Sequence, residues 1–384
     1  MRPRCVVVGA GRMAGGFIAP LLHDAGWEVV LVSRNAAVVA AVERSRSIVV
    51  RTGRGERELS GVRAAGFDRR ALGGLVVDCD LLATAVGPAS LSAVGAALAA
   101  PLRLRLATTG RPLNLLAFEN HRRASYLLAS ALLDRCPPLA GAVGRSLGIS
   151  TVAAWGAVTE RTIEDGAVVF RGDGIDECYA NAAALVPATA PVPLPLADPH
   201  DVRMVEKLWR FNAGHAAAAL AGWLRGAATV DEAMRDGAVA AHVAAVLEET
   251  ELAFRAHVAA RPPASPVPQR PAGEMLSRYA DGSLADPVTR VAREPLRKLA
   301  ADDRLVGPAL ACLAAGATPS ALARTCAAAL AYAAATEPYG TERDLDLLGP
   351  AETFAAISGL AAEDELSQLV GEAYEQLAPE AIAA

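Results

Sequence analysis

The chain lacks any long, uncharged apolar run, although hydrophobic residues make up 53% of its 384 positions. No stretch approaches the roughly 18 apolar residues that a helix needs to cross a bilayer. The N-terminal residues Met-Arg-Pro-Arg-Cys are not followed by an apolar segment with a small-residue cleavage site. We therefore expect no membrane partner and a cytoplasmic location.

Concentrated basic charge and metal-binding cysteine spacings are also missing. The formal net charge is −5, whereas nucleic-acid binding normally needs a basic surface. The cysteines are far apart, with no CxxC or Cys/His ligand spacing, at Cys5, Cys79, Cys136, Cys178, Cys312 and Cys326. We interpret them as isolated reduced thiols and expect no metal site, which disfavours a zinc-dependent alcohol dehydrogenase.

Short β-branched runs alternate with helical segments in the first half of the chain. Cys5–Gly9 and Glu28–Ser33 have the composition of buried parallel strands, and Phe17–Ala25 between them has helical spacing. Similar apolar runs follow at Leu81–Val86 and Leu113–Phe118. This alternation predicts an α/β fold with a doubly wound sheet.

Further strands are expected before a proline-rich break. Ile48–Thr52 and Glu56–Val62 flank a Gly-Arg-Gly turn and predict a hairpin, while Thr151–Val158 and Ala167–Arg171 would close the first domain. Proline removes donors and fixes φ, so we place a domain boundary in Val186–His200 and expect domains at 1–190 and 191–384. The second domain is predicted to be mostly helical, with helices over Val202–Gly214, Ala216–Arg225, Val230–Ala259, Pro308–Leu313 and Pro319–Ala334. A second proline-rich stretch, 260–272, is predicted to be a loop between helices.

The turn after the first strand has the pattern of a dinucleotide-binding site. Gly9 permits a tight turn, Gly11 lets a pyrophosphate approach the backbone, and Ala14 lets the following helix lie close to the sheet. The turn lies after a strand and before a helix, which is the context this motif requires. The sequence therefore predicts a Rossmann-type N-terminal domain; the alternative is an ordinary glycine-rich turn.

The residues after the second strand bear on the choice of nucleotide. An NAD site usually presents a carboxylate there, but this chain has Ser33-Arg34-Asn35, and arginine can pair with a 2′-phosphate. The pattern favours NADP over NAD, unless Arg34 stacks on the adenine or points into solvent. The candidate cofactor-binding residues are Gly9, Gly11, Arg12, Met13, Ala14, Ser33, Arg34, Asn35, Thr84, Val86, Gly87 and Glu119.

Three polar residues in the helical half form a candidate catalytic cluster. At about 100° per residue, Lys207, Asn212 and His215 fall within about 140° of one another on a helix. A desolvated lysine can accept a hydroxyl proton, an amide can stabilise a developing alkoxide, and an imidazole can orient the substrate oxygen or the lysine. The same spacing also fits three polar residues on a solvated helix face.

Together with this spacing, four further segments resemble the polyol-specific long-chain dehydrogenases, the mannitol dehydrogenase family, and most closely its mannitol 1-phosphate branch. The segments are Gly9–Phe17, Thr84–Pro88, Phe118–Arg122 and Arg293–Ala309. The resemblance implies that Lys207 is the general base in oxidation, that Asn212 and Asn120 form the oxyanion hole, and that His215 positions the reactive hydroxyl. It implies no catalytic metal.

The chain departs from the family pattern at Ser33, where the family has an acidic residue, at Ala14, where a third glycine is common, and at Glu160–Ile163, where a proline is missing. A basic cluster could bind a substrate phosphate or form a solvated helix face; its candidate members are Arg293, Arg297, Lys298 and Arg304.

We expect interconversion of mannitol 1-phosphate and fructose 6-phosphate, the same chemistry on another polyol, ketose or cyclitol, or a silent dinucleotide-binding regulator. Intact Lys207, Asn212 and His215 argue against the regulator. The partners expected are a small polyol or sugar phosphate, and the chain is compatible with a monomer or a homodimer.

Overall fold

The computed structural model describes residues 2–187, 189, 191–262, 270–336 and 340–377. Its internal contacts divide the chain into two units, Met1–Arg203 and Met204–Ala384. The boundary expected at residue 190 falls on a position outside the described residues and stays a prediction.

A mainly parallel sheet forms the core of the first unit. Its strands are β1 (Arg4–Val8), β2 (Glu28–Ser33), β5 (Arg63–Gly66), β6 (Leu81–Thr84), β7 (Leu113–Ala117), β8 (Leu147–Ala154), β11 (Cys178–Asn181) and β12 (Leu196–Ala197). Among the described residues their order is β12-β11-β8-β7-β6-β1-β2-β5. All neighbours are parallel except β8 and β11. In the central register, Val6 lies between Val30 and Leu82.

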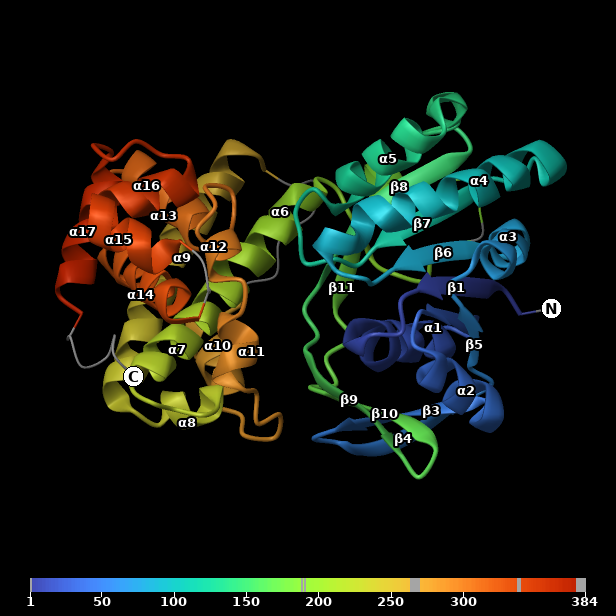
Figure 1. Ribbon diagram of the computed structural model, residues 1–384, viewed down its shortest axis with the longest axis horizontal. Helices are drawn as coiled ribbons and strands as arrows, with labels where there is room; N and C mark the ends of the chain where they lie inside the picture. Colours follow the sequence, from blue (N-terminus) through green and yellow to red (C-terminus); the bar gives the residue numbers. More distant parts are fainter. Residues whose placement is uncertain (1, 188, 190, 263–269, 337–339, 378–384) are drawn as a thin grey trace. The chain divides into compact units, whose positions relative to one another are not determined.

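Helices cover both faces of this sheet, as Figure 1 shows. They are α1 (Ala19–Asp24), α2 (Ala36–Ser45), α3 (Arg69–Asp78), α4 (Leu91–Thr109) and α5 (Ala124–Arg135), with short 3₁₀ turns η2 (Pro88–Ser90), η3 (Pro137–Gly141) and η4 (Ala182–Ala184). Val7 and Leu31 pack with α1 and α2, whereas Val6 and Val30 pack with α3, α4 and α5. Successive side chains of a strand point to opposite faces of the sheet, and both faces are covered by helices. The strands are therefore apolar throughout. The predicted doubly wound fold is confirmed.

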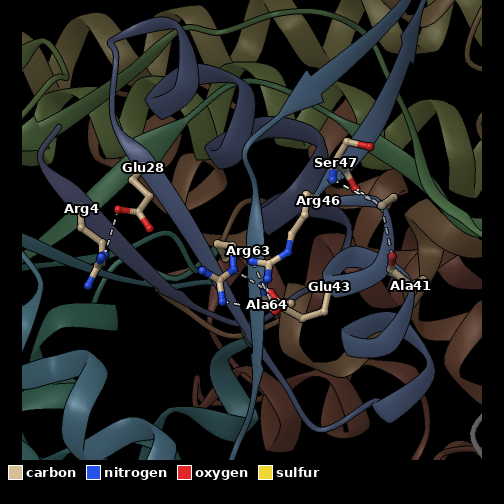
Figure 2. A network of polar contacts seen from close by, with 9 residues as sticks. Arg4, Glu28, Ala41, Glu43, Arg46, Ser47, Arg63 and Ala64 are labelled. Atoms are coloured by element: carbon tan, nitrogen blue, oxygen red, sulfur yellow. Dashed lines mark hydrogen bonds and ion pairs between the residues drawn. The ribbon is translucent and has the colours of Figure 1, made fainter. Parts of the chain in front are cut away.

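The edge strand β5 is fastened to the sheet by a carboxylate from α2, drawn in Figure 2. Glu43 accepts hydrogen bonds from the backbone N–H of Ala64 at 2.8 Å and from Nε of Arg63 at 3.1 Å. Arg46 lies 3.5 Å from the same carboxyl group. These contacts satisfy an exposed strand edge and hold α2, whose first turn follows the second strand.

The predicted hairpin at residues 48–62 is present, but it belongs to a separate sheet. Its strands, β3 (Ser47–Thr52) and β4 (Gly55–Ser60), join β9 (Val158–Glu164) and β10 (Ala167–Gly172) in the order β4-β3-β10-β9. The single strand predicted at 151–158 is wrong, because β8 ends at Ala154 and β9 begins at Val158. A Cβ atom at Gly156 would lie 2.2 Å from Phe17, so the turn between the two sheets has no room for a side chain.

This second sheet packs directly on the start of the first helix. That helix begins at Arg12 and continues as a π-helical segment, η1 (Ala14–Ile18), after which the backbone N–H of Ala19 bonds to the carbonyl of Ala14. A Cβ atom at Gly15 would lie 2.0 Å from the ring of Phe170, and one at Gly16 would lie 2.6 Å from Val158. The small residues continue to Gly16 because two sheets, rather than one, pack against this turn.

The second unit is helical. Its elements are α6 (His200–Val205), η5 (Glu206–Asn212), α7 (Ala213–Leu224), α8 (Val230–Met234), α9 (Gly237–Ala260), α10 (Ala272–Tyr279), α11 (Val288–Ala292), α12 (Pro295–Lys298), α13 (Val306–Ala314), α14 (Ser320–Thr336), α15 (Thr341–Leu348), α16 (Pro350–Ser358) and α17 (Glu365–Glu375). Helix α6 begins within the first unit. No helix among the described residues is long and apolar enough to cross a membrane.

Two of the predicted helix boundaries are wrong. The residues predicted as two helices, 202–214 and 216–225, lie in one continuous helical stretch that ends at Leu224 and contains a π-helical segment. The helix predicted over 230–259 is broken, because the side chain of Asp236 accepts a hydrogen bond from the backbone of Ala238 and starts a new helix.

We predict that Gly15→Ala destabilises the protein by about 1–3 kcal/mol, because the added methyl group overlaps the ring of Phe170. The matched control is Gly74→Ala on α3, where no heavy atom lies within 4 Å of the new Cβ. That variant should be about 0.5–1 kcal/mol more stable, since it removes an exposed helix glycine. Equilibrium denaturation measures both, and equal effects would contradict the packing argument.

Candidate active site

The predicted cofactor-binding residues gather at the carboxyl edge of the main sheet. Gly9 follows β1, Ser33 ends β2, Thr84 ends β6 and Glu119 follows β7. Because these strands are parallel neighbours, their carboxyl ends lie along one edge. Open α/β sheets bind their ligands at this edge.

The glycine turn has the backbone geometry that a pyrophosphate site needs. Gly9 has a φ of +121°, and a Cβ atom there would lie 2.5 Å from the carbonyl oxygen of Ala85. At Gly11 the nearest heavy atom to an added Cβ would be 3.9 Å away, so the backbone is open. The helix begins at Arg12, directly after Gly11, a residue without a side chain that could cap it. The turn therefore fits the diphosphate of a dinucleotide, which would bind to its N–H groups.

Two arginines join the second sheet to this turn. Nη1 of Arg12 donates to the carbonyl of Thr159 at 3.0 Å, and Nη1 of Arg161 donates to the carbonyl of Ala10 at 2.8 Å. Arg12 was among the predicted residues, whereas Arg161 was not. Both guanidinium groups add positive charge beside the backbone that would hold the phosphates.

The three residues at the end of β2 and after it make different contacts. Ser33 accepts a hydrogen bond from the backbone of Asn35, and the Asn35 side chain accepts two from the first turn of α2. The side chain of Arg34 is exposed and makes no hydrogen bond or ion pair with any described residue. Asn35 is thus occupied as a helix cap, and Arg34 beside it is an exposed cationic group.

Glu119 is a buried brace between two strand ends. One carboxylate oxygen accepts the hydroxyl of Thr84 at 3.0 Å, and the other accepts the backbone N–H of Val86 at 3.1 Å. Burial raises its pKa. These bonds shape the loop up to Gly87, which has a φ of +85°. Asn120, the next residue after Glu119, is half-buried in the first unit.

In the second unit, Lys207 and Asn212 lie in the π-helical segment η5 (Glu206–Asn212). The backbone N–H of Ala213 bonds to the carbonyl of Leu208, five residues earlier. A turn closed by i→i+5 bonds is about one residue wider than an α-helical turn, so residue i+5 lies above residue i. The wide turn therefore places Asn212 more nearly over Lys207 than a regular α-helix would.

The hydroxyl of Tyr279 contacts the helix backbone next to this wide turn. It donates to the carbonyl of Phe211 at 2.7 Å, and the backbone of His215 also hydrogen-bonds to the phenol oxygen. Phe211 and His215 are four residues apart, so the hydroxyl contacts one helical turn, on either side of Asn212. A Cβ atom at Gly214 would lie 2.8 Å from this oxygen, which explains the glycine.

Lys207 is buried, with only 9% of its surface exposed. Burial lowers the pKa of its amine from 10.5 to about 7, with further contributions from the positive charges of Arg304 and Arg278. An amine with this pKa is partly neutral at physiological pH and can accept a proton. The alternative of a solvated helix face does not hold for Lys207.

A buried cluster of ion pairs contacts the residues of the wide turn. Glu206 is 1% exposed and lies 3.2 Å from Arg270 and 3.8 Å from Arg210. Arg210 also pairs with Glu251 at 2.7 Å and donates to the backbone of Arg270. These contacts fix the residues on either side of Lys207 without placing a carboxylate on its amine.

His215 lies one turn further along the helix and is packed between aromatic rings. Its ring stacks on Tyr279, with centroids 5.3 Å apart and planes inclined by 8°, and it contacts Phe211 at 5.8 Å. Its Nε2 lies 3.4 Å from a carboxylate oxygen of Asp286. Burial lowers the pKa of His215 more than this carboxylate raises it, so the imidazole is held neutral.

The four basic residues proposed from sequence differ in whether their side chains already have hydrogen-bond or ion-pair partners. Lys298 is buried and donates to the carbonyls of Ala292 and Arg293, and Arg297 pairs with Glu294 and Asp303.

Arg293 has an exposed side chain. Arg304 pairs with Asp303 through Nε at 2.7 Å, whereas its Nη2 is buried and has no partner among the described residues. Of the four, Arg304 has the unsatisfied buried donor.

Sequence reasoning missed Arg278, Tyr279 and Asp286. They lie more than sixty positions beyond the Lys207–His215 segment and belong to no recognisable spacing. Arg161 was visible only as part of an altered family segment, with no signal that its side chain contacts the glycine turn.

Two family models match the chain. The mannitol dehydrogenase Rossmann domain matches residues 3–146, and the mannitol dehydrogenase C-terminal domain matches residues 203–378. A mannitol-1-phosphate 5-dehydrogenase of Brevibacillus brevis is 32% identical over 371 residues, covering 95% of each chain. One from Paenarthrobacter aurescens is 33% identical and covers 86% of each chain.

Solved structures share the fold at low sequence identity. Mannitol 2-dehydrogenase of Pseudomonas fluorescens, solved with NAD and D-mannitol, superposes with a TM-score of 0.79 at 14% identity, covering 100% of this chain and 93% of that one. A substrate-free D-sorbitol dehydrogenase gives a TM-score of 0.76, also at 14% identity, covering 100% of this chain and 94% of the other.

The lowered pKa of Lys207 predicts a pH-dependent stability. Between pH 7 and 10.5 the unfolded chain binds more protons at this residue than the folded chain, so the free energy of unfolding should rise with pH. Relative to Lys207→Met, the wild type should gain up to about 1.4 kcal/mol per pH unit in this window. Chemical denaturation across the window measures this difference. A difference in the free energy of unfolding that does not change with pH would show that the pKa of the Lys207 amine is not lowered.

Proposed function

This chain belongs to the mannitol dehydrogenase family, and from that membership we propose that it oxidises the secondary alcohol of a sugar-alcohol phosphate, with mannitol 1-phosphate as the first candidate. It is a polyol dehydrogenase, an oxidoreductase acting on CH–OH groups. The observation that carries the proposal is the buried amine of Lys207, whose pKa of about 7 suits a proton acceptor.

Lys207 is proposed as the base. When bound, a nicotinamide dinucleotide supplies the hydride acceptor for oxidation and the hydride donor for reduction. As the substrate C–H bond breaks, the neutral amine takes the hydroxyl proton and the carbon becomes a ketone. In the reverse direction the ammonium returns that proton to the oxygen. The released proton passes from Lys207 to solvent after oxidation.

Neutral donors are proposed to stabilise the oxygen while its charge develops. The amide of Asn212 lies on the same wide turn as Lys207, and Asn120 of the first unit is the second candidate donor. His215, held neutral by burial, is proposed to bind a substrate hydroxyl without adding positive charge. Amides suit this role because they stabilise an alkoxide without competing for the proton.

A phosphate on the substrate is proposed to bind Arg304. Its Nη2 is a buried donor without a partner among the described residues, and its charge acts on Lys207, so the two groups are neighbours. A guanidinium group can donate two parallel hydrogen bonds to phosphate oxygens. The relatives named above as mannitol-1-phosphate 5-dehydrogenases support a phosphorylated substrate.

For the cofactor, we propose NADP in preference to NAD. Arg34 is exposed and uncommitted after β2, and no carboxylate stands there to repel a 2′-phosphate. The segment that departs from the family, Glu160–Ile163, leaves a second candidate substrate class: another polyol, ketose or cyclitol. The silent regulator is not favoured, since the similar proteins are named as dehydrogenases.

A cytoplasmic location is proposed because the cysteines, Cys5, Cys79, Cys136, Cys178, Cys312 and Cys326, are all unpaired thiols, which suits a reducing compartment. Monomer and homodimer remain the two expected oligomeric states.

The decisive experiment is a cofactor-oxidation assay with phosphorylated and unphosphorylated polyols and ketoses. We predict turnover of mannitol 1-phosphate and fructose 6-phosphate, with a rate of alcohol oxidation that rises through about pH 7 as Lys207 loses its proton. Lys207→Met should lower turnover by about 10²-fold or more at unchanged nucleotide affinity. Turnover that survives this change would remove Lys207 from the role of base.

Arg34→Ala should weaken NADP binding by about tenfold or more and leave NAD binding nearly unchanged, because only NADP offers a 2′-phosphate to the guanidinium group. Fluorescence titration with both reduced cofactors measures the two dissociation constants. Equal losses for the two cofactors would refute the role of Arg34.

A further inference from the structure

Asp286 is fixed in place by backbone pairing before its side chain makes any contact. The backbone N–H of Val230 donates to the carbonyl of Asp286 at 2.9 Å, and that of Val288 donates to Ala228 at 3.0 Å. Thr229 and Pro287 form an isolated bridge between these bonds. The carboxylate therefore projects from a rigid segment just before α11, a helix that packs on α7.

The carboxylate of Asp286 faces two partners. Both of its oxygens accept hydrogen bonds from Arg290, one turn along α11, through Nε and Nη2. The oxygen that pairs with Nη2 also lies 3.4 Å from Nε2 of His215. Although burial raises the pKa of Asp286, the hydrogen bonds from Arg290 and His215 bring it to about 2. The carboxylate is therefore ionised at neutral pH.

An ionised carboxylate determines which nitrogen of His215 carries the proton. Both carboxylate oxygens are acceptors, so Nε2 must be the protonated nitrogen in a neutral imidazole. Nδ1 then has a free lone pair and makes no hydrogen bond to any described residue. Stacking on Tyr279 opposes a rotation of the ring that would exchange the positions of Nδ1 and Nε2.

Arg290 opposes the tendency of this carboxylate to favour protonation of His215. An isolated carboxylate beside an imidazole favours the imidazolium form. Here the bidentate guanidinium group compensates the negative charge, and Arg278 on α10 adds a second positive charge near the ring. The charged groups that act on His215 are thus Asp286, Arg290 and Arg278, and two of the three oppose its protonation.

We propose that Asp286 and Arg290 are positioning residues that hold His215 as the neutral Nε2–H tautomer, so that Nδ1 accepts a hydrogen bond from a substrate hydroxyl. The role of the hydroxyl rests on the proposed function; the tautomer does not. In this arrangement Nδ1 of His215 can bind only a hydrogen-bond donor, such as a hydroxyl group of the substrate. His215 does not act as a proton donor. A fixed acceptor beside the base adds orientation without competing with Lys207 for its proton.

The tautomer can be measured without any turnover. Proteins labelled with ¹⁵N-histidine distinguish protonated and unprotonated ring nitrogens by NMR, and His215→Gln assigns the signal. We expect Nε2 protonated and Nδ1 unprotonated in the wild type. A wild-type His215 with its proton on Nδ1 would overturn the proposal even if polyols are turned over.

Asp286→Asn provides the kinetic arm. The asparagine oxygen can keep one bond from Arg290, while its amide now donates toward Nε2 and moves the proton to Nδ1. We expect the NMR signal to switch and kcat/KM for the polyol to fall by about tenfold or more, at unchanged nucleotide affinity. The matched control is Asp231→Asn, which alters another buried aspartate paired with an arginine four residues on, Arg235 at 2.8 Å, with no histidine beside it. The control should leave kcat/KM unchanged.

Arg290→Met provides a second, independent arm. Without the guanidinium group, the carboxylate should raise the pKa of His215 by at least one unit, seen as a shifted NMR titration and as a new loss of activity at acidic pH. An unshifted titration, or an Asp286→Asn variant that behaves like Asp231→Asn, would refute the positioning role. If the tautomer and its shifts are as expected but no polyol reacts, the proposed function fails and the positioning pair stands.

Discussion

The hydroxyl of Tyr279 contacts the helical segment that carries Lys207, Asn212 and His215, and the proposed catalytic arrangement depends on this contact. It donates to the carbonyl of Phe211 at 2.7 Å, next to a turn widened by i→i+5 bonds. The wide turn places Asn212 more nearly over Lys207, and the ring of His215 stacks on Tyr279. One phenol side chain thus contacts both the backbone of the wide turn and the ring of His215.

The side chain of Lys207 is buried. An isolated ammonium ion is costly in a buried position, and no described carboxylate compensates it, so the site lowers the pKa of the group instead of pairing it. The carboxylates nearby are committed elsewhere: Glu206 to Arg270, and Asp286 to Arg290. Each of these acidic groups is paired with an arginine, and the pKa of Lys207 is lowered without a compensating carboxylate among the described residues.

Local patterns in the sequence predicted the elements whose causes are local. The strand at Glu28–Ser33 has the predicted bounds, and the glycine turn lies where the spacing placed it. The helix break at Asp236 also has a local cause, a capping side chain before Gly237, and was missed because the apolar periodicity continues across it. The split of 151–158 between two sheets was not predictable, because it depends on Phe17 lying against Gly156.

By itself, the sequence determined a doubly wound domain with a dinucleotide turn, a helical second half, and a lysine, an amide and an imidazole on one segment. Spacing along a chain encodes such features because they involve neighbours within a few residues. Only the tertiary structure decided that the segment is wound as a π-helix, that Lys207 is buried beside Arg304, and that Asp286 faces His215. Those properties arise from residues far apart in the chain, and a pKa or a tautomer is set by the groups in contact with the residue, whatever their distance in sequence.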